Sequence, residues 1–300
     1  MEYKIGAELD GKTVKYCLFS HLGLSRAQVT ALKKKENGIL VNGERRFVTA
    51  LLREGDRLCL ALEDEEPQEA LVPWDFPIEI LFEDDAILCV SKPAHMPTHP
   101  SLNHYDDTLA NAVAGYYQKK GRPFVFRAAN RLDRDTTGVV LAAKNKSVSY
   151  MLASQIAGRS VEKRYIALLS GELENNEGTI DRNILRAQDS LMLRRTDDLL
   201  GDPARTSYRV LERKNGATLV EALPLTGRTH QLRVHFAYIG HPIIGDTMYG
   251  QASPYIDRQA LHAFSLTFTH PTNGERMTVT APLPADMQKV LKELGFETVF

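Results

Sequence analysis

The sequence has few cysteines and no long apolar run. Cys17, Cys59 and Cys89 are the three cysteines in 300 residues, and their odd number and wide spacing argue against a disulfide framework and a zinc knuckle. No apolar stretch approaches the roughly 20 residues that a membrane-spanning helix needs. The first residues also lack the basic and then apolar order of a signal peptide. These absences predict a cytoplasmic protein that is not attached to a membrane.

Two kinds of cofactor motif are also missing. The sequence contains no glycine-rich dinucleotide loop and no His-Glu-x-x-His pair. Five histidines in the C-terminal half follow no metal-ligand spacing, and such histidines are more often structural than metal-binding. They are His230, His235, His241, His262 and His270. We therefore expect no cofactor and no metal ion.

The acidic residues are unevenly distributed. The net charge is −1, which by itself argues weakly against a nucleic-acid partner. Residues 1–60 nevertheless carry 11 Lys and Arg against 7 Asp and Glu, whereas residues 61–90 carry no basic residue and 10 acidic ones. The parts on either side of this acidic segment are therefore mildly basic. Local basic patches, rather than net charge, attract phosphates.

The hydrophobic pattern predicts a small module, a linker and a larger domain. In residues 1–62, Ser25 and Gln28 have the spacing of a capping box before a helix that runs to Glu36. Asn42-Gly43 then predicts a hairpin turn. Residues 63–77 are acidic and Pro-containing, as in flexible linkers. Residues 78–300 contain many short strands and few helices, which predicts an α+β fold with a mixed, largely antiparallel sheet.

One stretch in the larger domain combines charged and buried-type residues. Residues 130–136 alternate charges, and residues 139–143 form an apolar run typical of a buried strand. Carboxylates in a loop at the mouth of such a strand can be held rigidly and still reach a substrate. Taken alone, this stretch is equally typical of a surface loop with ordinary ion pairs.

Several motifs in order resemble the RluA-type pseudouridine synthases. These are Arg-Leu-Asp at 131–133 with Thr-Thr-Gly at 136–138, Lys-Arg-Tyr-Ile-Ala at 163–167, and Gly-Arg-Thr-His-Gln-Leu-Arg-Val-His at 227–235. The match continues through residues 240–250, 261–263 and 270–271. The family usually has His at the position of Asn130. The resemblance implies an RNA pseudouridine synthase that isomerises uridines in rRNA, in tRNA or in both, and whose fold is also α+β.

The resemblance also implies the site residues. It places the catalytic carboxylate on Asp133, with Asp135 as a competing carboxylate that we assign to structure. Burial of an unpaired carboxylate raises its pKa, so a guanidinium is expected beside it, with two parallel donors. The resemblance assigns this partner to Arg233. Arg228 is the alternative, although its position before a predicted helix better suits phosphate contact.

Three further residues are implied to contact the target nucleotide. Tyr165 would stack on the uracil ring, and Leu232 would pack on the other side. A uridine within a stem cannot reach Asp133, so the target must be unpaired or flipped out. Arg131 would fill the vacated position or hold the flipped nucleotide. The alternative for each residue is an ordinary core or surface role.

The N-terminal module resembles the small α-L RNA-binding domain of a ribosomal small-subunit protein. The resemblance rests on Ser-Arg at 25–26, Val-Asn-Gly at 41–43 and Gly-Asp at 55–56. Arg26, Lys33 and Lys34 fall on one face of the predicted helix and are candidate phosphate contacts. A solvated helix face is the usual alternative. With such a module, ribosomal RNA is favoured as the partner of a monomeric enzyme.

Three rival functions use the same residues differently. An RNA-binding protein of the same fold could have lost its chemistry, but Asp133, Tyr165 and Arg233 are all present. A glycosidase usually needs two carboxylates that flank the bond. A generic α+β domain does not explain the ordered motifs. The products distinguish these rivals, because they are pseudouridine in RNA, free uracil or nothing.

Overall fold

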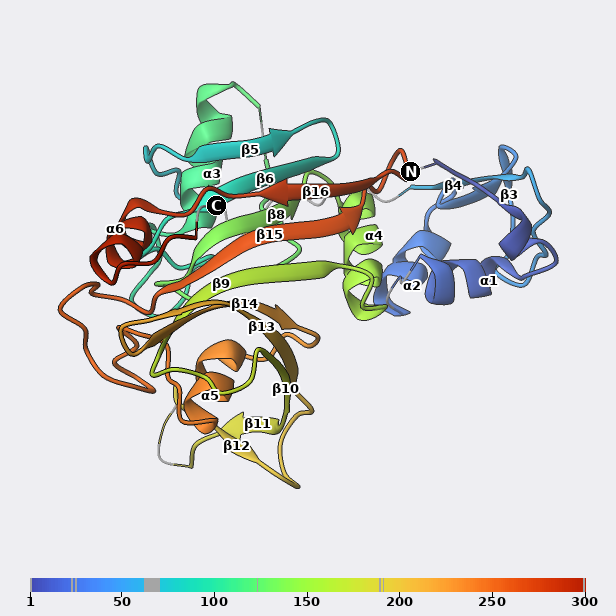
Figure 1. Cartoon of the computed structure of the whole chain (residues 1–300). Helices are drawn as coiled ribbons and strands as arrows, with labels where there is room; N and C mark the ends of the chain where they lie inside the picture. Colours follow the sequence, from blue (N-terminus) through green and yellow to red (C-terminus); the bar gives the residue numbers. More distant parts are fainter. Residues whose placement is uncertain are drawn as a thin grey trace.

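A computed structural model describes residues 2–22, 24, 26–61, 71–122, 124–188, 190, 192–298 and 300 of the chain (Figure 1). For residues 26–28 and 31 it describes the backbone alone. The predicted N-cap Ser25, the side chain of Arg26 and residues 63–70 of the predicted linker therefore lie outside the described part.

A small sheet near the N-terminus has its own apolar core. Its elements are β1 (Glu2–Lys4), η1 (Ala7–Leu9), α1 (Val14–Tyr16), η2 (Cys17–His21), α2 (Arg26–Lys34), β2 (Ile39–Val41), β3 (Glu44–Arg45) and β4 (Arg57–Leu60). The strands are antiparallel in the order β1-β4-β2-β3. The core contains Val29 and Leu32 from α2 and Leu58 from β4. The three-residue spacing in α2 thus places its apolar face on the sheet.

The predicted hairpin turn after β2 is confirmed. Asn42 and Gly43 both have positive φ, at 54° and 83°, as a type I′ turn requires of its two central residues. Val41 pairs with Glu44 across the turn. An Asn-Gly pair therefore sets the register of β2 and β3 locally.

A ten-stranded sheet forms the centre of the larger part of the chain. Its strands are β5 (Glu79–Glu83), β6 (Ile87–Lys92), β7 (Arg127–Ala128), β8 (Thr137–Ala143), β9 (Glu162–Ser170), β10 (Glu177–Asp181), β13 (Arg205–Lys214), β14 (Ala217–Pro224), β15 (Leu261–Thr269) and β16 (Arg276–Thr280). The order is β10-β13-β14-β9-β15-β8-β6-β5, with β16 paired to β15 and β7 to β8. Only the β8–β15 pair is parallel among the described strands. The predicted α+β class with a mixed, largely antiparallel sheet is confirmed.

Two helices cover opposite faces of one half of this sheet. They are α3 (Leu109–Lys119) and α4 (Lys146–Ala157), and Figure 1 shows them on either side of β6 and β8. Because side chains alternate along a strand, Leu88 and Val90 pack with α3, whereas Ile87 and Cys89 pack with α4. All of β8 is buried, as its apolar run predicts.

The helix starts follow from local capping residues. Thr108 accepts a hydrogen bond from the backbone of Asn111 at the start of α3, and the Asn111 side chain bonds back to the Thr108 backbone. Asn145 accepts from the backbone of Val148 at the start of α4. Each of these capping interactions joins residues only three positions apart in the chain.

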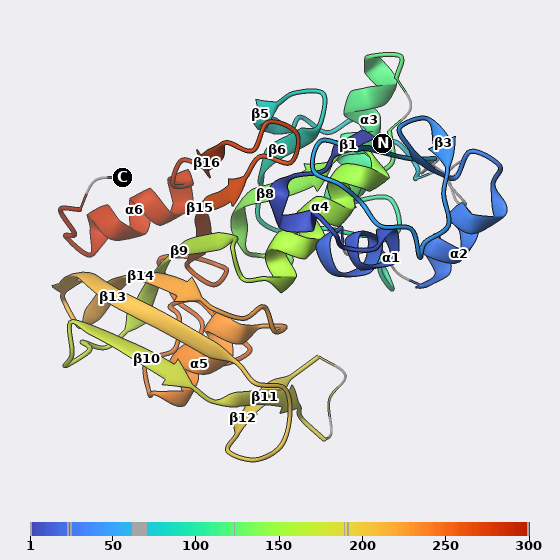
Figure 2. The ribbon, with the colours of Figure 1, turned by 90° about the vertical axis from the view of Figure 1, so that its right-hand side faces the viewer.

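A third helix packs beside the other half of the sheet. Helix α5 (Gln231–Tyr238) lies inside the curve of β10, β13 and β14 (Figure 2), and its Phe236 is buried against Tyr208 of β13. The remaining elements are β11 (Asn183–Arg186), β12 (Arg194–Asp197) and α6 (Ala285–Glu293). The β11–β12 pair forms a separate two-stranded sheet next to α5.

The N-terminal sheet contacts the larger part of the chain at α4. Tyr150 of α4 packs against the apolar core of the N-terminal sheet, in agreement with the position of that sheet beside α4 in Figure 1. At the end of the predicted linker, Trp74 and Phe76 pack with the core around α3. None of the described helices is both long and apolar enough to cross a membrane.

Candidate active site

The loop at residues 129–136 is fastened to the strand that follows it. The amide of Asn130 donates to the carbonyl of Val139 at 3.0 Å and accepts from the backbone of Leu141 at 2.8 Å. Gly138 lies close to the parallel strand β15, and a Cβ there would lie 2.2 Å from the carbonyl oxygen of Ala263. Its φ of 115° also favours glycine. The loop therefore enters β8 in one defined conformation.

A buried lysine forms a hydrogen bond to the backbone of the loop. Lys92 is fully buried, and its ammonium group donates to three backbone carbonyls, including that of Arg134 in the loop at 2.9 Å. Burial lowers the pKa of Lys92 to about 7, against the opposing effect of the nearby charges of Asp135 and Asp133. Three acceptors match the three donors of a protonated ammonium. This lysine therefore supports the loop and does not face the cleft.

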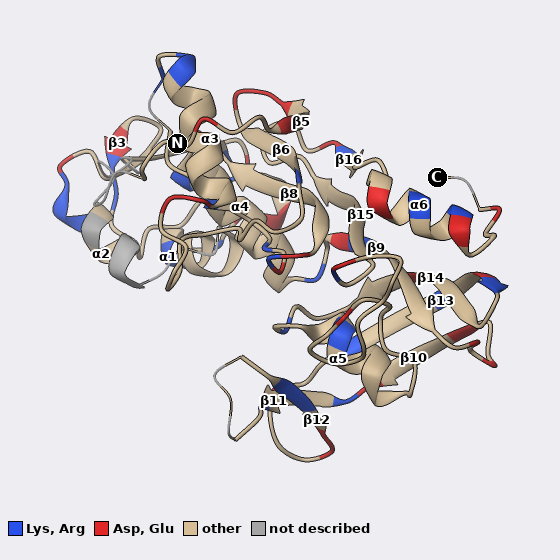
Figure 3. Cartoon of the chain, turned by 90° about the vertical axis from the view of Figure 1, so that its left-hand side faces the viewer, with Lys and Arg blue, Asp and Glu red and all other residues tan. Residues whose placement is uncertain are grey.

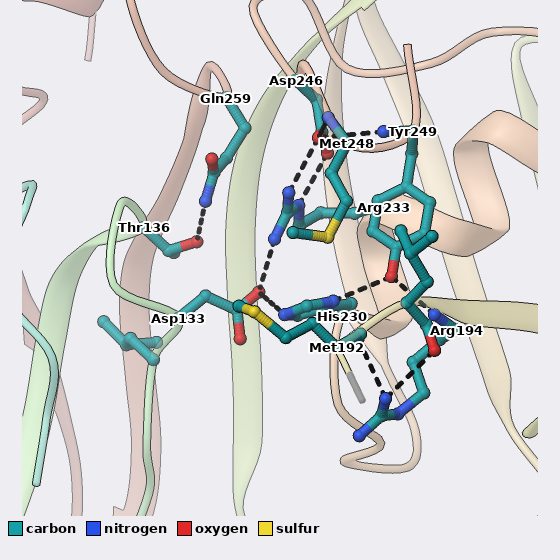
Figure 4. Close-up of polar contacts among 12 residues, drawn as sticks. Asp133, Thr136, Met192, Arg194, His230, Arg233, Asp246, Met248, Tyr249 and Gln259 are labelled. Carbon is teal, nitrogen blue, oxygen red and sulfur yellow. Dashed lines mark hydrogen bonds and ion pairs between the residues drawn. The ribbon is translucent and has the colours of Figure 1, made fainter. Parts of the chain in front are cut away.

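Two further side chains, from the segment before β15, also bond the loop. Arg258 is buried; its NH1 donates to the carbonyl of Asp135 at 3.1 Å. The same guanidinium makes two hydrogen bonds, of 2.6 and 2.9 Å, to Asp286 of α6. Gln259 donates to Thr136 at 3.2 Å (Figure 4). The loop is thus held by segments before and after it in the chain.

Thr98 bonds the loop peptide next to Asp133. Its buried hydroxyl donates to the carbonyl of Leu132 at 2.9 Å and accepts from the amide of Leu132 at 3.2 Å. We expect Thr98→Val to lower the free energy of unfolding by about 1–3 kcal/mol, because a buried peptide loses both partners. The rate should fall as well, because the loop is no longer fixed. Chemical denaturation and single-turnover kinetics measure the two effects.

Thr267→Val is the matched control for this prediction. Thr267 bonds the hydroxyl of Thr278 at 2.8 Å on an exposed face of the sheet. The same chemical change there should alter the free energy of unfolding by no more than about 0.5 kcal/mol. Equal effects of the two substitutions would contradict a special role for Thr98.

Asp133 lies at the floor of a cleft, next to Arg233. The Asp133 side chain is 25% exposed, and its Oδ2 lies 3.6 Å from NH1 of Arg233. The Arg233 guanidinium donates its two parallel hydrogen bonds to a different carboxylate. Its Nε and NH2 bond Asp246 at 2.6 and 2.8 Å (Figure 4). The structure thus brings Asp133 and Arg233 together, but the expectation of two parallel donors to Asp133 is wrong.

The Arg233–Asp246 pair has an electrostatic reason. The Asp246 side chain is completely buried, and a buried carboxylate needs a fixed cation and hydrogen bonds. Burial acts to lower the pKa of Arg233, but the hydrogen bonds and charge of Asp246 outweigh it and raise that pKa. Arg233 is therefore a permanent cation whose third nitrogen is held towards Asp133.

A histidine also faces Asp133. Nε2 of His230 lies 4.0 Å from Oδ2 of Asp133, and its Nδ1 lies 2.8 Å from the hydroxyl of Tyr249. The backbone amide of Arg194 donates to that hydroxyl at 2.9 Å, so the tyrosine proton is available to Nδ1. Burial lowers the pKa of His230, and the charges of Arg233 and Arg194 add to this effect. A neutral imidazole with its proton on Nε2, facing Asp133, satisfies all of these contacts.

The cleft above Asp133 has a volume of about 980 Å³. Tyr165 of β9 and Leu232 of α5 line it, and Arg131 lies at its exposed edge. Burial, together with the negative charge of Asp133, raises the pKa of Tyr165 above its usual value, so the hydroxyl is neutral at physiological pH. The structure therefore gathers four of the predicted residues, from three separate segments, around Asp133.

The other predicted residues lie at different places. Arg228 lines the cleft and donates to the carbonyl of Pro203 at 3.2 Å, with Asp202 at 3.6 Å. Asp135 bonds Nδ1 of His95 at 3.0 Å, as suits the structural role assigned to it. Lys33 and Lys34 are exposed at the end of α2, and Figure 3 shows α2 in the N-terminal part of the chain, far from α5.

Sequence reasoning missed Asp246, Tyr249 and His230. All three lie within motifs that the resemblance covers, at residues 227–235 and 240–250. No signal in the sequence marks Asp246, because nothing there indicates that Arg233 is buried and needs a second carboxylate. The number of residues between them and Asp133 also does not indicate how far apart their side chains lie in the folded protein.

The arrangement suits a reaction that needs one ionised carboxylate. A single aspartate with a fixed guanidinium can act as a nucleophile or a base, and an apolar and aromatic wall can hold a planar ring. No group of three or more His, Cys, Asp or Glu in the described residues is placed to hold a metal ion.

Known proteins share this sequence pattern and fold. The family described as RNA pseudouridylate synthase matches residues 86–238. The uncharacterised RNA pseudouridine synthase YjbO of Bacillus subtilis is 38% identical over 271 residues, which are 90% of this chain and 95% of that protein. Ribosomal large subunit pseudouridine synthase D of Xanthomonas campestris is 36% identical, over 87% of this chain and 82% of that protein.

A solved structure resembles the larger part of the chain. Human RNA pseudouridylate synthase domain containing 1 superposes with a TM-score of 0.59 and 28% sequence identity. The alignment covers 77% of this chain and 97% of the human one.

Proposed function

Because this chain belongs to the RluA-type family of RNA pseudouridine synthases, we propose that it isomerises specific uridines of large-subunit ribosomal RNA and that Asp133 is the catalytic residue. The observation that carries the choice of Asp133 is its position on the cleft floor, 3.6 Å from the permanently charged Arg233. The relative that is named a ribosomal large subunit synthase supports the substrate.

The reaction rearranges bonds without a net exchange of electrons. The bond between C1′ of the ribose and N1 of uracil breaks, and C1′ is joined to C5 instead. C5 loses its proton, and N1 gains one, so the product has the same composition as the substrate. Asp133 acts as the nucleophile or the base in this sequence. Arg233, with NH1 at 3.6 Å from Oδ2, and His230, with Nε2 at 4.0 Å, place a cation and an imidazole beside its carboxylate.

The surrounding side chains would position the flipped uridine. Tyr165 stacks on the uracil, and its neutral hydroxyl can donate a hydrogen bond. Leu232 packs on the ring from the side of α5. Arg131, at the exposed edge of the cleft, fills the position that the uridine leaves in the RNA or holds the flipped nucleotide. Water is excluded by the ring itself once it is bound.

Mapping of pseudouridines tests the substrate. RNA from cells that lack this protein is compared with RNA from the same cells supplied with the wild type or with Asp133→Asn. Sites in large-subunit rRNA that return only with the wild type are the expected result. Sites in tRNA alone would move the substrate to tRNA. If no site changed, the alternative of an RNA-binding protein without catalysis would replace this proposal.

The division of labour along the chain is part of the proposal. Residues 1–62 form an α-L RNA-binding module, residues 63–77 are an acidic linker, and residues 78–300 form the catalytic domain. The separate apolar core of the N-terminal sheet supports this division. Arg26, Lys33 and Lys34 contact RNA phosphates, and Arg228 contacts a phosphate at the cleft.

Replacement of both Lys33 and Lys34 by glutamine tests the module. The slope of log affinity against log salt should become shallower by roughly 0.7–0.9 for each phosphate that the variant no longer neutralises. Folding stability should change by no more than about 0.5 kcal/mol, because both side chains are exposed. Filter binding of a large-subunit rRNA transcript between about 50 and 200 mM salt measures the slope.

The matched control removes two charges elsewhere. Lys289 and Lys292 are exposed on α6, and their replacement by glutamine changes the net charge equally. An equal decrease of slope in both double variants would mean that net charge alone matters, and an unchanged slope after replacement of Lys33 and Lys34 would remove them from the RNA contact.

The protein is proposed to act as a cytoplasmic monomer. Cys17, Cys59 and Cys89 are free thiols, as suits a reducing compartment. Light scattering after gel filtration measures the mass, and a dimer would contradict the first part of this proposal.

A further inference from the structure

Lys163 is a cleft residue that has no part in the proposed reaction. It lies on β9 two residues before Tyr165, and residues two apart on a strand point to the same side. Both line the cleft that contains Asp133. The ammonium of Lys163 makes no hydrogen bond or ion pair with any other residue in the described part of the chain.

Arg164, the neighbour of Lys163 on the same strand, has carboxylate partners. Arg164 bonds Glu162 at 2.6 Å and lies 3.3 Å from Glu221. Carboxylates therefore neutralise Arg164, whereas no carboxylate among the described residues pairs with Lys163. Burial lowers the pKa of Lys163 and no neighbouring charge that the structure describes opposes it, whereas the carboxylates around Arg164 outweigh the effect of burial and raise its pKa. A partly buried cation without a partner costs folding free energy, so this lysine is not explained by stability.

The space around the ammonium suits an anion. Nζ of Lys163 lies near the backbone of Gly227: a Cβ added there would be 3.7 Å away, an ordinary contact distance. The cleft wall also includes Arg159 and Arg276. Its two carboxylates, Asp133 and Glu162, already have arginine partners. The Lys163 ammonium is therefore a positive charge on this wall that no lining carboxylate neutralises.

We propose that Lys163 binds a backbone phosphate of the RNA strand, next to the uridine that lies against Tyr165 and Asp133. This inference rests on the proposed function, because a flipped nucleotide brings its flanking phosphates to the mouth of the cleft. Lysine suits this ligand as a point charge that needs no fixed geometry. The phosphate supplies the partner that the ammonium does not find among the residues that the structure describes.

The test compares Lys163→Met with the wild type in the binding of a uridine decamer, a probe without a specific site. The slope of log affinity against log salt should become shallower by about 0.7, the value for one phosphate of single-stranded RNA. Lys163→Arg should restore it. The melting temperature should stay the same or rise, because an unpaired buried charge is removed. A wild-type slope in Lys163→Met, or a lower melting temperature with the slope unchanged, would overturn the proposal.

Two controls isolate the phosphate. Lys289→Met removes the same charge from an exposed position on α6 and should leave the slope unchanged. A decamer with uncharged methylphosphonate linkages should bind Lys163→Met and the wild type equally, and a persistent difference would point to the base instead of the phosphate. Lys163→Gln serves as a second variant if the methionine protein does not fold.

Kinetics on a large-subunit rRNA transcript complete the test. Removal of an interaction that is equally strong before and during the reaction should raise KM about tenfold and leave kcat within about threefold. A wild type that modifies no RNA, together with a reduced slope in Lys163→Met, would reject the proposed function and keep the phosphate site. An active wild type with no change in the Lys163→Met slope would reject the phosphate site alone.

Discussion

Asp133→Asn is expected to lower the rate of pseudouridine formation by at least about 10⁴-fold, which is the size of effect that removal of a catalytic nucleophile or base has in other enzymes. An amide has no ionised oxygen for either role. The change is nearly isosteric, and the Asp133 side chain is 25% exposed, so packing should be preserved. Arg233 also keeps its main partner, Asp246. Single-turnover assays measure the loss of rate, and RNA binding by the same variant shows whether its fold and affinity are preserved.

The matched control is Asp135→Asn, two residues away in the same loop. The Asp135 carboxylate bonds His95 instead of facing Arg233, so the rate should stay within a few-fold of the wild type. A nearly wild-type rate for Asp133→Asn, or an equal decrease for both variants, would reject Asp133 as the catalytic residue.

Arg233→Lys is expected to cost roughly 100-fold in rate, although it keeps the positive charge. The guanidinium uses two nitrogens for Asp246 and directs the third to Asp133. One ammonium cannot occupy all three positions, and an orientation error of about 1 Å can cost a hundredfold. Stability should fall as well, because removing one partner of a buried ion pair costs about 3–5 kcal/mol and a lysine recovers only part of this.

Rates measured against pH separate the two tasks of this arginine. A rate that stays low at every pH supports the orienting role, whereas a rate that recovers as pH rises would show that the guanidinium only keeps Asp133 ionised. Arg209→Lys is the control, because Arg209 pairs with Glu221 on an exposed part of β13. A wild-type rate for Arg233→Lys at neutral pH would exclude Arg233 and direct attention to Arg228.

Local interactions made much of the fold predictable. The caps at Thr108 and Asn145 and the turn at Asn42 depend on residues three or fewer positions apart, and the sequence displays such pairs directly. The strand order could not be predicted in this way. The parallel pairing of Thr137 with His262 joins segments 125 residues apart, and no local pattern contains it.

The candidate site was predictable to a similar degree. Family motifs indicated Asp133, Tyr165 and Arg233, and the structure places them around one cleft. The hydrogen-bond partner of the Arg233 guanidinium was not predictable from those motifs, because Asp246 pairs with Arg233 only when the fold buries both side chains. Lys163 could not be singled out for a different reason: a lysine without a partner is visible only when all of its surroundings are known.

The contact of Arg258 with both the Asp133 loop and α6 sets an order for assembly during protein synthesis. Ribosomes release the chain from its N-terminus, so residues 129–136 emerge about 150 residues before Asp286. Until α6 has left the exit tunnel, the Arg258 guanidinium lacks its carboxylate partner and the loop lacks one of its anchors. A nascent enzyme, surrounded by the ribosomal RNA that it is proposed to modify, therefore lacks this anchor of the Asp133 loop until Asp286 has been made and α6 has folded.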